Sequence, residues 1–161
     1  MQLLEYKDIP AGEIPVFSAG EGVSLKALAG NAEVNGVAVE GRLQVDDTLP
    51  IYLDITLAAG AQATVTVPDT HNTLVYTYDG AVTLHHEGAQ PEQTAPAQRL
   101  SRLTGSGVVS VSNATDDVSR VLILAGKPLG EPIAQHGPFV MNTPEEIAQA
   151  VADYQAGTLT D

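Results

Sequence analysis

The chain has 161 residues, 43% of them apolar, which suits one domain with a hydrophobic core and argues against disorder. Its 20 acidic and 7 basic residues give a formal net charge of −13, so direct nucleic-acid binding through a basic patch is not expected. The absence of cysteine excludes disulfides and thiolate metal sites. No apolar run approaches the ~20 residues that span a bilayer, and the N-terminus has no secretory signal, so we expect a cytoplasmic protein without membrane contact.

Alternation of apolar and polar residues predicts strands in the first half of the chain. Residues 1–20 contain two prolines and are expected to be an extended lead-in, because residues before proline favour extended backbone. Residues 23–27, 51–57 and 62–67 alternate with the period of a half-buried strand, and residues 59–61 are expected to be a turn.

A turn signal divides the next β-rich segment. Asp79-Gly80 separates residues 73–78 from residues 81–84 and predicts a hairpin, because a tight primed turn needs positive φ. Residues 88–97 are polar and contain proline, so they are expected to be a loop.

Two further strands are predicted at residues 108–112 and 118–125, with residues 113–117 as the turn between them. The apolar run Val121-Leu122-Ile123-Leu124 indicates a strand buried on both faces. Short strands with turn chemistry between them are typical of an all-β sandwich or barrel, here placed at residues 21–125.

A helix is predicted at residues 143–157. Thr143 suits the N-cap, Pro144 the first helical position, and Glu146 the third position of a capping box. Gly157 suits the C-terminal cap. One face of the helix is apolar at spacings of three and four, with Ile147, Ala150, Val151 and Tyr154.

The segment before this helix is the most distinctive part of the chain. Residues 126–143 read GKPLGEPIAQHGPFVMNT, a stretch in which prolines and glycines fix an ordered loop over residues 126–142. This string closely resembles the C-terminal signature of the pirin family, whose members contain two cupin domains. Other segments are similar to the same half of that family: Tyr6 to Pro10, Tyr52 to Leu57, and His71-Asn72 with Val75-Tyr76 and Gly80.

The resemblance covers the chain from about Tyr6 to Gly157 and implies a single domain, residues 1–161, like the C-terminal pirin cupin alone. It implies an all-β cupin: an antiparallel β-sandwich or barrel of the double-stranded β-helix type, with one C-terminal α-helix packed outside. The chain is then either a truncated piece of a two-cupin protein or a natural single cupin.

The resemblance also carries functional expectations. In pirin-like proteins the N-terminal cupin holds iron or another divalent transition metal, some members are quercetin 2,3-dioxygenases, and the animal homologue is a nuclear transcriptional co-regulator. For this chain it implies no catalytic residue and no cofactor. The expected partner is an N-terminal pirin cupin or another protein, with a homo-oligomer as an alternative.

A cupin metal site needs several imidazoles and a carboxylate that converge from the barrel wall, in the form His-x-His followed by glutamate. Counting back from Gly80, those positions fall near Thr66, Pro68 and Asn72, none of which is a suitable ligand. His71 stands alone beside a turn. His85 and Glu87 would share a strand face at spacing two but lack a third ligand. These three are the weak metal candidates, and His136 is expected to order its loop.

Three hypotheses follow. The first is a non-catalytic cupin that supports a metal-bearing cupin, with a candidate contact surface at Pro138, Phe139, Val140, Met141, Ile147 and Val151. The second is a stand-alone metal-dependent dioxygenase that uses His71, His85 and Glu87. The third is a small-molecule-binding module whose barrel holds an apolar ligand.

Overall fold

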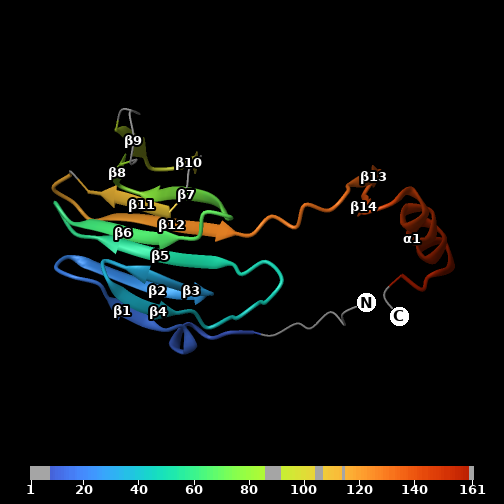
Figure 1. The fold of residues 1–161 in the computed structure, drawn as a ribbon, viewed down its shortest axis with the longest axis horizontal. Helices are drawn as coiled ribbons and strands as arrows, with labels where there is room; N and C mark the ends of the chain where they lie inside the picture. Colours follow the sequence, from blue (N-terminus) through green and yellow to red (C-terminus); the bar gives the residue numbers. More distant parts are fainter. Residues whose placement is uncertain (1–7, 86–91, 104–106, 114, 160–161) are drawn as a thin grey trace. The chain divides into compact units, whose positions relative to one another are not determined.

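The computed structural model describes residues 8–85, 92–103, 107–113 and 115–159 (Figure 1). The chain divides into two compact units, Met1–Pro128 and Leu129–Asp161. The first unit is a sandwich of two six-stranded sheets, and the second contains a two-stranded sheet and one α-helix. No helix in this described part of the chain has the length and apolar character needed to cross a membrane.

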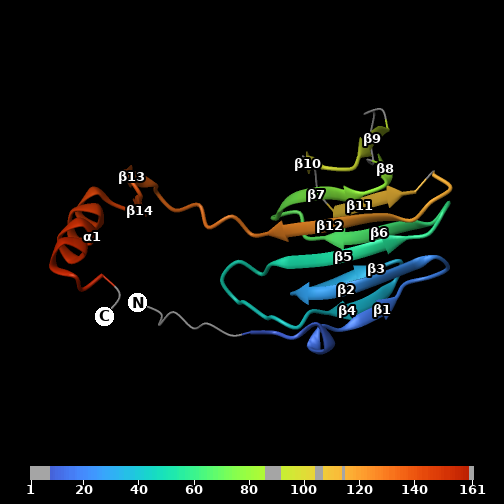
Figure 2. The same cartoon turned by 180° about the vertical axis from the view of Figure 1, so that it is seen from behind.

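The two large sheets of the first unit are antiparallel throughout their strand pairs, and Figure 2 shows them from behind. Sheet A has the order β1 (Val16–Ser18), β2 (Val23–Ala29), β5 (Ile51–Leu57), β12 (Ser119–Gly126), β7 (Asn72–Asp79) and β10 (Arg99–Leu103). Sheet B has the order β4 (Val37–Glu40), β3 (Asn31–Val34), β6 (Gln62–Val67), β11 (Gly107–Ser112), β8 (Ala81–His85) and β9 (Gln93–Pro96).

The chain changes sheet at most of its turns. From β5 to β8 each successive strand lies in the opposite sheet, and the same holds from β9 to β12. This winding is that of a double-stranded β-helix, and it confirms the all-β architecture predicted from the sequence. Because every such turn joins the two layers, the turns act as the corners of the sandwich.

The core lies between the two sheets. Alternate residues of each central strand point inward, so β5 contributes Ile51, Leu53, Ile55 and Leu57, all 0–2% exposed. The inward residues of the facing strands are also short and aliphatic, such as Val65 of β6 and Val111 of β11. The period-two pattern of the sequence therefore correctly identified the strands that form this core.

The predicted hairpin at Asp79-Gly80 is wrong, because β7 lies in sheet A and β8 in sheet B. Gly80 has φ +69°, as the turn signal requires, but the turn is a corner between layers. A Cβ at Gly80 would lie 2.3 Å from Oγ of Ser119, so the corner is also packed too closely for a side chain. Local sequence specified the turn but not the sheet that receives the next strand.

Four further segments differ from the expectation. The described part of the lead-in contains a 3₁₀ helix, η1 (Ala11–Glu13), and strand β1, which pairs with β2. The expected loop at 88–97 contains β9 where it is described, because β8 offers that strand a free edge; residues 88–91 lie outside the described residues. The hairpin of β3 and β4 and the strand β10 were not predicted.

Strand β12 was expected to be buried on both faces, and this is wrong. Val121 and Ile123 are fully buried in the core, whereas Leu122 and Leu124 are half-buried on the outer side of sheet A. The apolar run arises because this strand contributes to the core and to an apolar outer face.

The second unit contains a hairpin of β13 (Ala134–His136) and β14 (Phe139–Met141) where an irregular loop was expected. The predicted helix is confirmed as α1 (Pro144–Ala156). Thr143 accepts a hydrogen bond from the backbone N–H of Glu146 and its own N–H donates to the Glu146 carboxylate, which completes the capping box. The ring of Tyr154 contacts Phe139 edge-on, with ring centroids 6.0 Å apart.

Candidate functional site

The interior of the sandwich is the place where a cupin would hold a metal. Its buried polar side chains are His71, Thr73, Thr77, Asn113 and Ser119. Over the described residues, no group of three or more histidines, aspartates or glutamates could hold a metal ion. Thr77 Oγ1 is buried there without a hydrogen-bond partner, but a single neutral hydroxyl does not fit iron or a similar ion. The described residues of this interior therefore do not fit a transition metal.

His71 is engaged in a structural hydrogen bond. It is 8% exposed, and its Nε2 lies 2.8 Å from the carbonyl oxygen of Leu49. Its Nδ1 lies 3.3 Å from the hydroxyl of Thr70. Leu49 has φ +43°, a strained value for a residue with a side chain, so this contact holds an unfavourable part of the loop before β5 in place.

His85 lies on the outer face of sheet B. Its strand neighbour Leu84 points into the core, so the imidazole points away from it. Nδ1 of His85 lies 3.0 Å from Oε1 of Glu92, and Nε2 lies 2.6 Å from Oγ of Ser112. The structure thus does not bring His85 together with the buried His71, and Glu87 lies outside the described residues.

The hydrogen bonds of His85 connect it to Ser112 on one side and to Glu92 on the other. The same arrangement of hydroxyl, imidazole and carboxylate forms the nucleophile, general base and orienting group of an acyl-transfer triad. Such chemistry also needs backbone N–H groups directed at a developing oxyanion. Ser112 and His85 lie within β-strands, where successive backbone N–H groups are engaged in ladder hydrogen bonds. We therefore interpret the trio as polar contacts of a solvent-facing sheet.

The candidate contact residues lie in the second unit, as does His136, which is exposed on β13. Val140 is 57% exposed and Pro138 is exposed, whereas Phe139, Met141 and Val151 are half-buried. Ile147 is 8% exposed, so its side chain offers little surface to a partner.

Asn113 is a structural residue that sequence reasoning missed. It is 1% exposed at the corner between β11 and β12. Its Nδ2 donates to the carbonyl oxygens of Leu57, Ala58 and Asp117 at 3.1, 3.1 and 2.7 Å. Its Oδ1 accepts hydrogen bonds from the backbone N–H and the hydroxyl of Thr115. An asparagine as the first residue of the turn predicted at 113–117 was the available signal, because asparagine commonly bonds to nearby backbone.

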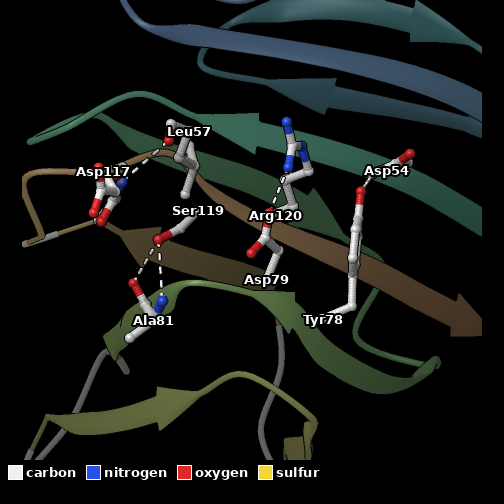
Figure 3. Close-up of polar contacts among 9 residues, drawn as sticks. Asp54, Leu57, Tyr78, Asp79, Ala81, Asp117, Ser119 and Arg120 are labelled. Atoms are coloured by element: carbon white, nitrogen blue, oxygen red, sulfur yellow. Dashed lines mark hydrogen bonds and ion pairs between the residues drawn. The ribbon is translucent and has the colours of Figure 1, made fainter.

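Ser119 links the corner between β11 and β12 to the corner between β7 and β8, as Figure 3 shows. It is fully buried, accepts a hydrogen bond from Ala81 N–H at 3.1 Å and donates one to Ala81 C=O at 2.9 Å. The first residue of β8 is thereby tied to the first residue of β12, on the other sheet. Asn113 and Ser119, two of the buried polar side chains of this unit, thus stabilise its corners.

Polar pairs also lie on the outer face of sheet A (Figure 3). The Tyr78 hydroxyl donates to Oδ1 of Asp54 at 2.7 Å, and Arg120 forms an ion pair with Asp79. Partial burial, and then the Asp54 carboxylate, raise the pKa of Tyr78 from 10.0 to about 12.

This shift has a defined consequence for stability. The folded state holds the proton more tightly, so its contribution is fully present below pH 10.0 and is lost as the pH rises through about 12. Two pKa units correspond to about 2.7 kcal/mol. Because the pair lies on a solvent-facing surface, screening reduces this to about 1 kcal/mol.

Comparison with known proteins is consistent with this architecture. The family model of the pirin C-terminal cupin domain matches residues 52–160. A putative quercetin 2,3-dioxygenase of Pseudomonas aeruginosa is 41% identical over 154 residues, which are 96% of this chain and 52% of that protein. Pirin of Homo sapiens is 33% identical over 151 residues, covering 94% of this chain and 49% of pirin.

Solved structures show the same likeness. The crystal structure of quercetin 2,3-dioxygenase from Acinetobacter baumannii matches with a TM-score of 0.77 and 30% identity, covering 96% of this chain and 50% of the other. The chain thus spans about half the length of the relatives that it matches.

Proposed function

This chain belongs to the pirin family, whose C-terminal cupin domain it matches, and we propose that it is the non-catalytic half of a two-cupin protein. Its role would be to support a metal-bearing cupin, which would carry any quercetin dioxygenase chemistry. The observation that carries the proposal is the aliphatic interior of the sandwich, where inward positions such as Leu53, Val65 and Ile123 offer no ligand atoms.

The second unit supports the proposal from another direction. Within α1 only Ile147 and Ala150 are buried, while Leu129, Ile133, Val140 and Tyr154 are 57–80% exposed. So small a unit buries too little apolar surface to offset the entropy of ordering its chain. We propose that it is stabilised by packing against the metal-bearing cupin, with the surface of Pro138 to Met141 and Val151 in the contact.

Metal content tests the absence of chemistry. The purified full chain, expressed with iron, nickel and manganese in the medium, is expected to hold less than about 0.1 transition ion per chain by elemental analysis. It should not consume quercetin above the rate of the buffer with the same metals. A stoichiometric ion that is lost in His71→Ala would instead identify a stand-alone metal-dependent cupin.

Co-expression tests the supporting role. The N-terminal half of the 41% identical Pseudomonas aeruginosa protein, produced together with this chain, is expected to co-purify with it as an equimolar complex. Failure of the two to associate at micromolar concentration would overturn the proposed role.

A further inference from the structure

The two outer faces of the sandwich differ in chemistry. On sheet B, the cross-strand rows that face outward are polar: Thr83, Ser112 and Gln62 form one, and His85, Ser110 and Thr64 the next. Such rows are typical of a sheet face in contact with water. The outer face of sheet A has a different composition.

On sheet A the outward positions gather tyrosine and leucine. One row runs Leu100, Tyr76, Leu122 across β10, β7 and β12, and the adjacent row runs Leu74, Leu124, Tyr52 across β7, β12 and β5. We call these six residues the tyrosine–leucine face. Leu100 is 57% exposed and the other five are half-buried, since neighbours in the two rows partly cover one another.

Charged residues border this face. Arg120 forms an ion pair with Asp79, Lys26 lies opposite Asp54 in the strand register, and Arg102 lies opposite Leu74. An apolar block of tyrosine and leucine beside arginine is typical of protein–protein interfaces rather than of solvated surface. The partner that fits it presents an apolar patch, with an acidic residue opposite Arg102.

The size of the face indicates how much of an interface it provides. Each outward residue of a sheet occupies about 4.8 Å across the strands and about 6.8 Å along them, so the six residues cover roughly 200 Å². A stable interface buries about 800 Å² on each partner. The face therefore supplies about a quarter of such an interface and forms its apolar centre, with neighbouring surface of sheet A around it.

We infer that the tyrosine–leucine face docks against the metal-bearing cupin of a two-cupin protein. This inference rests on the proposed function and assigns its partner to a particular sheet. This chain matches its relatives over 94–97% of its own length, and they are about twice as long. They therefore contain a second part of similar size in the same polypeptide, which could contact such a face.

The test uses the full chain and the co-expressed N-terminal half of the Pseudomonas aeruginosa relative. The double substitution Tyr76→Thr/Leu122→Thr replaces two apolar side chains of the face with threonine, which is typical of sheet B. It should raise the dissociation constant of the complex at least tenfold. Thr66→Ala/Thr94→Ala, on sheet B, is the matched control and should change the dissociation constant less than twofold. The thermal midpoint of each variant reports folding, and Leu100→Ser at the most exposed position replaces the double variant if that fails to fold.

Footprinting reads the same contact directly. Hydroxyl-radical oxidation of Tyr52 and Tyr76 should fall at least fivefold in the complex, while that of His85 on sheet B stays unchanged. A complex that forms equally well with the substituted face overturns the inference and leaves the proposed function standing. No complex with the unsubstituted chain overturns both. A dimer of the chain alone, dissociated by Tyr76→Thr/Leu122→Thr, assigns the face to a second copy and also overturns the inference.

Discussion

Asn113 provides the most direct test of how the two sheets are held together. We expect Asn113→Ala to lower the free energy of unfolding by about 3–5 kcal/mol. The substitution removes five hydrogen bonds and takes the Asn113 donor from the buried Leu57 carbonyl, while the Ala58 carbonyl keeps its hydrogen bond from the Ala61 N–H. A net hydrogen bond is worth about 0.5–1.5 kcal/mol, and a buried unpaired group adds to the loss.

Asn113→Asp separates hydrogen bonding from side-chain volume. The carboxylate has nearly the same shape but no hydrogen to donate, so it would oppose three carbonyl oxygens. We expect it to cost at least as much as the alanine substitution at pH 7. Urea unfolding followed by circular dichroism measures both, with exposed Asn72→Ala as a control that should change stability by less than about 0.5 kcal/mol.

The reasoning would be refuted if Asn113→Ala lost less than 1 kcal/mol, or if Asn113→Asp were as stable as the wild type. Either result would mean that the corner is held by core packing alone. A loss of 3 kcal/mol should lower the melting temperature by about 6–12 °C for a domain of this size.

Three further substitutions probe other parts of the sandwich. Gly80→Ala should lower the free energy of unfolding by about 3 kcal/mol or more, because its Cβ would meet Ser119 Oγ at 2.3 Å. Gly60→Ala, also at φ +69° but in open space, should lower it by only about 1–2 kcal/mol. Equal losses in urea unfolding would show that the backbone conformation alone matters. Tyr78→Phe should remove the extra loss of stability that the wild type shows between pH 10.0 and about 12; identical pH profiles would contradict the raised pKa. His71→Ala should lower stability by about 1–2 kcal/mol through the lost contact to the Leu49 carbonyl, and an unchanged melting temperature would count against its structural role.

Some features were fixed by local chemistry and were therefore predictable. Helix α1 follows from Thr143, Pro144 and Glu146, because capping acts between residues that are close along the chain. The strands β2, β5 and β6 follow from period-two alternation, since one face of each must be buried. Asn35-Gly36 is the same kind of turn signal for the β3–β4 hairpin, and both residues have the positive φ, 50° and 78°, that such a turn needs.

The sequence alone determined the strands β2, β5 to β8, β11 and β12, the helix α1 and the acidic character of the chain. Tertiary structure alone decided which sheet each strand joins, because a turn such as Asp79-Gly80 fixes local φ and ψ but not the pairing edge. It also decided the roles of Asn113 and Ser119, whose hydrogen bonds reach 38–56 residues along the chain. The tyrosine–leucine face emerged only there, since its six residues come from four strands that the fold brings side by side.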